Sequence, residues 1–166
     1  MTKTLFLLRH ARAEEKPPEK KDIERELDSI GLQNSTRMGI NFQHKAYQFD
    51  IIVSSPAARA IKTASLIAEQ IKYPTDKIHE NPEVYEASVR TLLQVVNRLK
   101  DQWNTALLVG HNPAISYLTE YLTREEIGNI TTCGVVIIEF EISSWSEVSE
   151  GTGDLVLYEY PDLLNF

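Results

Sequence analysis

Short apolar segments alternate with amphipathic segments along the chain, and this alternation restricts its fold more than any other feature. Three apolar runs, residues 5–8, 49–53 and 106–109, have the length of a buried strand. Each precedes a stretch that could form a helix with one apolar face. The pattern predicts a doubly wound α/β fold, with a mostly parallel central sheet and helices on both faces. Residues 135–142 and 155–160 are expected to add flanking strands, including an antiparallel edge strand.

Composition limits the size, the location and the partners of the protein. The length of 166 residues, of which 42% are hydrophobic, predicts a single domain over residues 1–166. The net charge of −7 argues against a nucleic acid or a membrane as a partner. Cys133 is the only cysteine, so disulfides and cysteine-based zinc sites are excluded. No signal pattern or membrane-spanning run is present, so we expect a soluble, cytoplasmic protein.

Helix-starting residues follow the apolar runs. Asp28 is expected to cap the helix after the first run. After the second run, Ser55 could cap a helix with Pro56 at its first position, and Asn112 and Pro113 repeat this arrangement after the third. Residues 12–26, rich in charge and containing two prolines, are interpreted as a solvated connector.

Basic side chains stand where the predicted parallel strands end. Arg9 and His10 end the first run, Arg59 follows the second by one helical turn, and His111 follows the third. The carboxyl ends of parallel strands meet at one edge of the sheet, so these groups should converge there. Arginines and helix N-termini suit a compact anion, and phosphate fits best. Histidine is a phosphoryl acceptor that can be neutral near pH 7, and His10 is the preferred nucleophile.

Three motifs in this order, LLRHARA, SSPAARAIKT and VGHNP, resemble those of the histidine phosphatase superfamily and most of all its SixA-type phosphohistidine phosphatases. The resemblance runs from residue 5 to about residue 113, and it implies a phosphoglycerate mutase-like fold. It implies that His10 attacks phosphorus and is transiently phosphorylated. Arg9, Arg59 and His111 would bind the three equatorial oxygens, and water would then release inorganic phosphate.

No cofactor and no metal are expected, because the arginines can supply the positive charge that the reaction requires. They would also repel a metal cation from the two histidines. Nearby guanidinium groups should keep His10 neutral, and we expect His111 to be the charged ring.

Two further residues are assigned from the resemblance. Glu83 falls where the superfamily places an acid that protonates the leaving group, although it could equally be a surface glutamate. Arg25, in a segment similar to the SixA pattern R-x-L-T-x-x-G, could reach the rim of the pocket. The chain departs from the superfamily in having Ala11 in place of the usual glycine, and Lys16 stands near the position where sugar-phosphate mutases carry an asparagine.

The substrate stays open at this point. Mutases and sugar bisphosphatases usually carry longer insertions over the site, so the short chain favours a protein phosphorylated on histidine. A phosphomonoesterase acting on a sugar or another metabolite is the alternative. A non-catalytic module that binds phosphorylated partners is a third hypothesis, although binding alone would not require a nucleophile. The sequence does not indicate the physiological partner, the oligomeric state or the role of the C-terminal segment.

Overall fold

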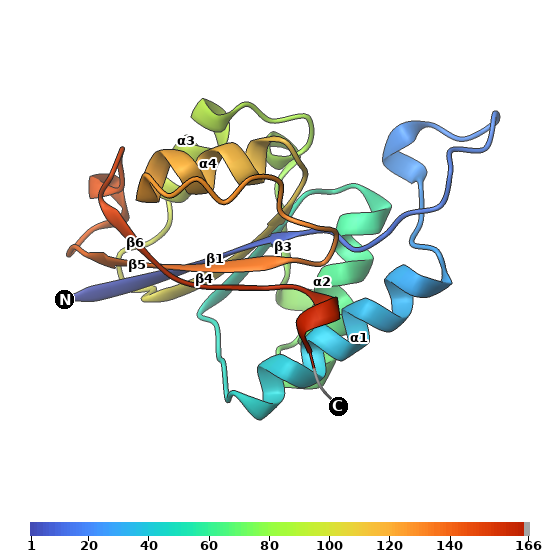
Figure 1. Ribbon diagram of the computed structural model, residues 1–166, viewed down its shortest axis with the longest axis horizontal. Helices are drawn as coiled ribbons and strands as arrows, with labels where there is room; N and C mark the ends of the chain where they lie inside the picture. Colours follow the sequence, from blue (N-terminus) through green and yellow to red (C-terminus); the bar gives the residue numbers. More distant parts are fainter. Residues whose placement is uncertain (165–166) are drawn as a thin grey trace.

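A computed structural model describes residues 1–164 and contains a six-stranded sheet (Figure 1). The order across the sheet is β3-β2-β4-β1-β5-β6. The strands are β1 (Thr2–Arg9), β2 (Ile51–Ser54), β3 (His79–Glu80), β4 (Thr105–Gly110), β5 (Val135–Glu141) and β6 (Gly153–Glu159). Strands β3, β2, β4 and β1 pair in parallel, whereas β5 pairs antiparallel with both β1 and β6. The predicted fold class, including an antiparallel edge strand, is confirmed.

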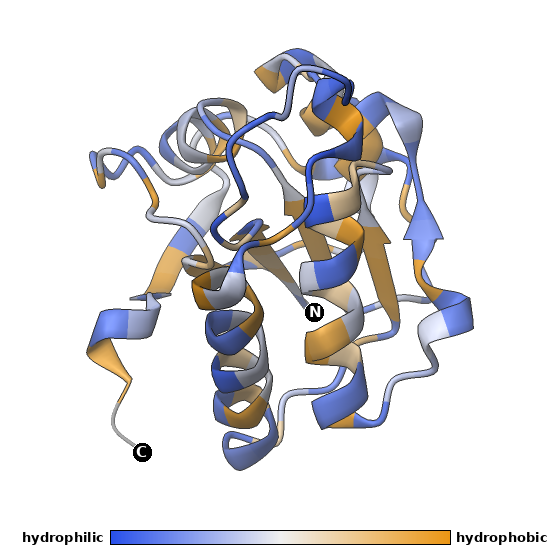
Figure 2. Ribbon diagram, turned by 90° about the vertical axis from the view of Figure 1, so that its right-hand side faces the viewer, coloured by the Kyte–Doolittle hydropathy of each residue, from blue (hydrophilic) through white to orange (hydrophobic). Residues whose placement is uncertain are grey.

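Two pairs of helices cover the sheet. Helices α1 (Ser29–His44) and α2 (Ala58–Ile71) pack together on one face, and α3 (Val89–Asn97) and α4 (Ala114–Thr123) cover the other (Figure 1). Figure 2 shows strands that are largely hydrophobic and helices along which hydrophobic and hydrophilic residues alternate.

The apolar run of β1 serves both faces of the sheet. Leu5 and Leu7 belong to the core beneath α3 and α4, whereas Phe6 and Leu8 belong to the core beneath α1 and α2. A strand buried on both faces has no solvent-facing side, so its sequence is continuously apolar. This burial explains why four apolar residues lead without interruption to Arg9.

The helix starts agree only in part with the sequence predictions. The Asp28 carboxylate accepts a bond from the Gly31 N–H and caps α1 as expected. The predictions for α2 and α4 are wrong, because these helices begin after Ala57 and Pro113 respectively, and neither has a side-chain cap. The hydroxyl of Ser55 and the amide of Asn112 make other contacts, which are described with the site.

The segment between β1 and α1 is ordered by its own polar contacts, and we call residues 12–28 the flap. A β-bridge joins Ala13 to Leu27. The Glu14 carboxylate accepts bonds from the Lys20 ammonium at 2.8 Å and from the Glu26 N–H at 2.9 Å. The flap also contains a short 3₁₀ helix, η1 (Asp22–Glu24). It is therefore more than the solvated connector that its composition suggested.

Within residues 1–164, no helix combines the length and the apolar content needed to cross a lipid bilayer.

Candidate active site

Three neighbouring strands end at the same edge of the sheet and deliver the basic residues there. Arg9 is the last residue of β1 and lies opposite Gly110, the last residue of β4. Ser54 ends β2 opposite Val109 of β4. His10 and His111 therefore follow neighbouring strands, and their ring centroids lie 5.0 Å apart. Arg59 enters from the first turn of α2, which begins shortly after β2.

His10 is held in the form that a nucleophile requires. Its Nδ1 lies 2.7 Å from the Ala11 carbonyl oxygen, which can only accept, so Nδ1 carries the proton. The lone pair of the neutral ring is therefore on Nε2. Burial is the main cause that lowers the pKa of His10 to about 3, and the charges of His111, Arg59 and Arg9 lower it further. The hydrogen bond to Ala11 raises this pKa but does not offset them. The imidazole is consequently neutral at physiological pH.

The backbone around His10 is fixed by three distant parts of the chain. The His10 N–H donates to the Gly110 carbonyl at 3.0 Å. The Ala11 N–H donates to the buried Thr63 hydroxyl of α2, also at 3.0 Å. The Cys133 N–H donates to the carbonyls of Arg9 and His10. These bonds fix the direction in which the His10 ring leaves the end of β1.

Arg9 and Arg59 share a bonding pattern that leaves a donor available on each. Arg9 Nη1 donates to the Ile130 carbonyl at 2.9 Å, and Arg59 Nη1 donates to the Asp22 carbonyl at 2.8 Å. Within residues 1–164, the Nε atoms of both arginines are buried and have no hydrogen-bond partner. Buried donors without partners are unfavourable unless a ligand completes them. Two guanidinium groups beside a neutral histidine indicate that this ligand is an anion.

His111 is fixed by a residue that follows β2. Its Nε2 forms a 2.8 Å hydrogen bond with the Ser55 hydroxyl, which also accepts the Ala57 N–H. Burial, followed by the charge of Arg59, lowers the pKa of His111 to about 4. The expectation that His111 carries a charge is therefore wrong for the free protein. A bound phosphate dianion would favour protonation of this ring, because an adjacent negative charge raises a histidine pKa.

The Asn112 side chain supports the arginine site instead of capping α4. Its Nδ2 donates to the Ile130 carbonyl, which also accepts Arg9 Nη1, and its Oδ1 accepts the Ser116 hydroxyl. The amide thus ties α4 to the segment that anchors Arg9.

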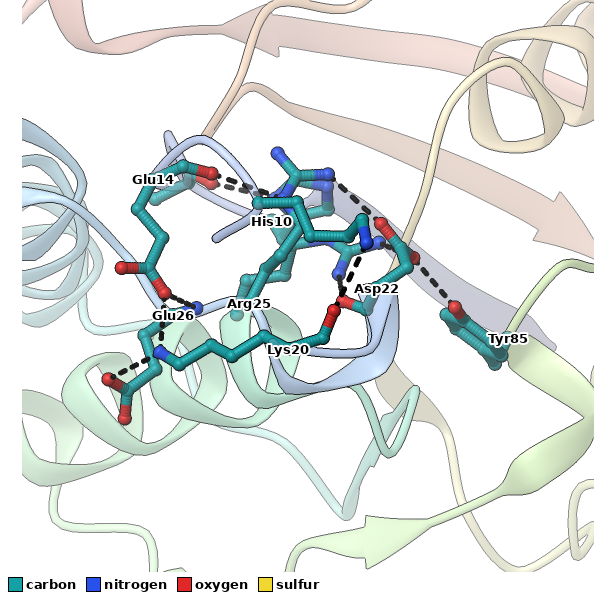
Figure 3. Close-up of polar contacts among 10 residues, drawn as sticks. His10, Glu14, Lys20, Asp22, Arg25, Glu26 and Tyr85 are labelled. Carbon is teal, nitrogen blue, oxygen red and sulfur yellow. Dashed lines mark hydrogen bonds and ion pairs between the residues drawn. The ribbon is translucent and has the colours of Figure 1, made fainter. Parts of the chain in front are cut away.

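The flap contributes Asp22 to the site, and the Tyr85 side chain lies across from Asp22 (Figure 3). Asp22 Oδ2 accepts bonds from Arg59 Nη2 at 3.0 Å and from the Tyr85 hydroxyl at 2.6 Å. The Tyr85 ring packs edge-on against His111, with centroids 5.6 Å apart. Sequence reasoning missed both residues. The only sequence feature that could have indicated Asp22 is its position three residues before Arg25. We find no sequence feature that indicates Tyr85.

Arg25 lies beside this cluster and binds the flap. Its Nη1 donates to Asp22 Oδ1 at 3.1 Å, and its Nε donates to the Glu14 carbonyl, also at 3.1 Å. Bonds from Tyr85, Arg25 and Arg59 hold the pKa of Asp22 well below its usual range, so this carboxyl is ionised. Arg25 is thus placed next to a partner of Arg59.

Glu83 is engaged elsewhere. It lies in the short 3₁₀ helix η3 (Pro82–Val84), and its side chain is 43% exposed. Both carboxylate oxygens accept from Arg98 Nη1, at 2.9 and 3.1 Å. The structure therefore pairs Glu83 with Arg98, the C-cap residue of α3. The other four predicted site residues, Arg9, His10, Arg59 and His111, lie together.

The chemistry of the cluster suits phosphoryl transfer without a metal. Among residues 1–164, no group of three histidine, cysteine or acidic side chains is arranged to bind a metal ion. Burial raises the pKa of the Cys133 thiol to about 12, so a thiolate nucleophile is also disfavoured there. A neutral imidazole and fixed guanidinium donors are the groups that a loose phosphoryl transition state requires.

Solved phosphatase structures share this fold. The chain matches the protein histidine phosphatase SixA in complex with tungstate with a TM-score of 0.84 and 21% identity, over 98% of this chain and 99% of that one. SixA from Agrobacterium tumefaciens gives a TM-score of 0.83 and 23% identity, over 96% and 98% of the two chains. A mutant phosphoserine phosphatase from Entamoeba histolytica, in complex with phosphoserine, gives 0.70 and 17%, over 98% and 100%. At these identities the likeness shows a shared fold.

Sequence comparison supplies the family. No curated protein sequence matches significantly. The family model of the histidine phosphatase superfamily (branch 1) matches residues 5–88, which form just over half of the chain and include Arg9, His10 and Arg59. The protein therefore belongs to the histidine phosphatase superfamily, branch 1.

Proposed function

We propose that the protein is a phosphohistidine phosphatase that removes the phosphoryl group from histidine in another protein, through a covalent intermediate on His10. The observation that carries this proposal is the state of His10: a buried, neutral imidazole with its lone pair on Nε2. Beside it lie two arginines whose Nε donors have no partner among the described residues. The nucleophile and the anion site are thus both present before substrate binds.

In the proposed reaction, His10 Nε2 attacks phosphorus in line with the leaving group. A P–N bond forms to His10, and the bond to the substrate imidazole breaks, so the leaving nitrogen takes the electron pair. Arg9, Arg59 and His111 bind the equatorial oxygens, where charge must be stabilised. Water then attacks the phosphorus of phospho-His10, which releases inorganic phosphate and restores the neutral ring.

The leaving group decides whether Glu83 is needed. Transfer from one histidine to another exchanges two similar P–N bonds, so it requires less protonation of the leaving group than cleavage of an alkyl phosphate would. The pairing of Glu83 with Arg98 is compatible with such a reaction. We therefore propose no general acid role for Glu83 toward phosphohistidine.

The size of the chain is compatible with a protein substrate, but it does not separate the two candidates, because the chain also covers 100% of the phosphoserine phosphatase. The chain covers 99% of the SixA tungstate complex and 98% of the Agrobacterium SixA, so it has the same extent as these proteins.

A small-molecule phosphomonoesterase is the second candidate. The similarity to a phosphoserine phosphatase, at a TM-score of 0.70, favours it, because the same fold there accommodates a small phosphate ester. A role for Glu83 as general acid would belong to this alternative.

The test is turnover of a protein labelled with ³²P on histidine, compared with phosphoserine and sugar phosphates. We expect release of phosphate from the phosphohistidine protein and a transient label on the enzyme that is stable to base and labile to acid. His10→Ala should abolish both. Exclusive turnover of small esters would replace the proposal with the alternative. Binding without any labelled intermediate would indicate a non-catalytic module.

A further inference from the structure

The guanidinium of Arg59 is held from one side by a single flap residue. Arg59 is 6% exposed. Its Nη1 donates to the backbone carbonyl of Asp22 at 2.8 Å and its Nη2 to the carboxylate of the same residue at 3.0 Å. Each of these nitrogens carries two N–H groups, whereas Nε carries one. The Nε donor is the one that is buried and without a partner in the described chain.

Arg9 provides an internal comparison. It too is anchored through Nη1 to a backbone carbonyl, that of Ile130, and its Nε is also buried without a partner. The anchor of Arg9 belongs to a segment tied to the body of the protein by Asn112. The anchor of Arg59 is instead supplied by the flap. The orientation of Arg59 therefore depends on how firmly Asp22 itself is held.

Two side chains other than Arg59 hold Asp22, together with the flap network. The Tyr85 hydroxyl donates to its carboxylate at 2.6 Å, and Arg25 Nη1 donates to the other oxygen at 3.1 Å. Arg25 is in turn bound to the Glu14 carbonyl, and Glu14 to Lys20 (Figure 3). Charge-assisted hydrogen bonds of this kind fix both distance and direction. The Asp22 side chain is nevertheless 46% exposed, so its removal would leave no buried cavity.

We propose that Asp22 is a positioning residue for Arg59: by binding Nη1 and Nη2 it holds the guanidinium in the orientation in which it binds the phosphate. This inference rests on the proposed function, since it assigns Arg59 to phosphate binding. Preorganised donors stabilise a transition state because they do not have to be reoriented during the reaction. The flap is thereby a part of the phosphate site, although Asp22 itself does not touch the reacting atoms.

An opposite role is conceivable from the same contacts. A carboxylate beside a phosphate-binding arginine could act as an anionic competitor, which the substrate would have to displace. The two roles predict opposite signs: loss of a positioning residue weakens phosphate binding, whereas loss of a competitor strengthens it. The bond from Arg59 Nη1 to the backbone carbonyl of Asp22 favours positioning, because a neutral carbonyl orients the guanidinium without competing as an anion.

The experiment measures the affinity of the full-length protein for inorganic phosphate by calorimetry. We expect Asp22→Ala to weaken binding about tenfold, the factor expected for a weakened charge-assisted contact. Asp22→Asn keeps an oxygen acceptor and should lose about threefold, which also guards against a folding defect in the alanine variant. Glu19→Gln, which removes a charge from an exposed flap residue, is the matched control and should bind phosphate as the wild type does.

A double-mutant cycle with Arg59→Ala separates positioning from a merely structural role. If Asp22 acts through Arg59, Asp22→Ala should cause no further loss of phosphate affinity once Arg59 is absent. Equal or tighter binding by Asp22→Ala, or additive losses in the cycle, would overturn the inference while leaving the proposed function intact. Absence of phosphate binding by the wild type would overturn both.

Discussion

Replacement of Thr63 by valine tests how His10, the proposed nucleophile, is held in place. The Thr63 hydroxyl is fully buried, accepts the Ala11 N–H at 3.0 Å and donates to the Arg59 carbonyl at 2.7 Å. Valine has nearly the same shape but offers no acceptor, so the buried Ala11 N–H would lose its partner. A buried donor left unsatisfied costs about 1–3 kcal/mol of unfolding free energy. For a chain of this size, the melting temperature should fall by roughly 2–12 °C.

Thr63→Val should also lower the kcat of the proposed hydrolysis reaction. The Ala11 carbonyl accepts a hydrogen bond from His10 Nδ1–H, so movement of Ala11 would move the proposed nucleophile. We expect kcat to fall about tenfold or more in hydrolysis of phosphoramidate, the smallest P–N phosphoryl donor.

Thr63→Ser is the matched control for both measurements. It keeps the hydroxyl and loses one methyl group, worth about 1 kcal/mol. Its kcat should therefore remain close to that of the wild type. The reasoning is refuted if the valine and serine variants have the same kcat, because the hydrogen bond to Ala11 would then not position His10.

Three other predictions concern pH, Glu83 and a helix end. The pKa of His10 is about 3 in the folded protein and near 6.5 when unfolded, so the stability linked to its neutral form is complete above pH 6.5 and is lost as pH falls toward 3. The free energy of unfolding, obtained from urea titrations between pH 6.5 and 5, should therefore fall more steeply in the wild type than in His10→Gln, by roughly 1 kcal/mol per pH unit. Glu83→Gln should change kcat for a phosphohistidine protein less than about threefold, because both carboxylate oxygens bind Arg98; a loss near a hundredfold would make Glu83 the general acid. Lys72, the C-cap residue of α2, has a left-handed backbone with a φ of 60°, which glycine adopts more readily than lysine. Lys72→Gly should therefore raise the free energy of unfolding by about 0.5–1 kcal/mol. An unchanged urea midpoint would show that this conformation carries no strain.

The parts of the fold that could be predicted are those set by local pattern and by strand direction. A continuously apolar β1 indicates a strand covered on both faces, and parallel strands bring their carboxyl ends to one edge. Those two arguments suffice to bring His10 near His111 without any knowledge of side-chain contacts.

The starts of α2 and α4 could not be predicted because the expected capping side chains have other partners. Ser55 has the right chemistry for a cap, but its hydroxyl binds His111 and the Ala57 N–H before the helix begins. Asn112 is likewise occupied by Ile130 and Ser116. Capping preference is a local property, and here tertiary contacts within the site override it.

Asp22 escaped prediction for a similar reason. Its two most distant partners are 37 and 63 residues away along the chain, at Arg59 and Tyr85. The flap that carries it has the composition of a solvated loop, and its path depends on ion pairs that the linear sequence does not order. Periodicity and spacing cannot reveal a contact between a loop and two separate elements.

The bonds around His10 also have a consequence for the order in which this protein acquires its activity. Residues 9–11 are bound by Thr63, Gly110 and Cys133, which are spread over most of the chain. Contacts between residues so far apart in sequence form late, since each requires closure of a long loop. A nascent chain that ends at residue 88 would already contain the proposed nucleophile and both arginines, yet it would lack the carbonyl of Gly110 and the N–H of Cys133. We therefore expect phosphoryl transfer to begin only after β4 and the turn before β5 have joined β1, which makes activity a reporter of completed folding.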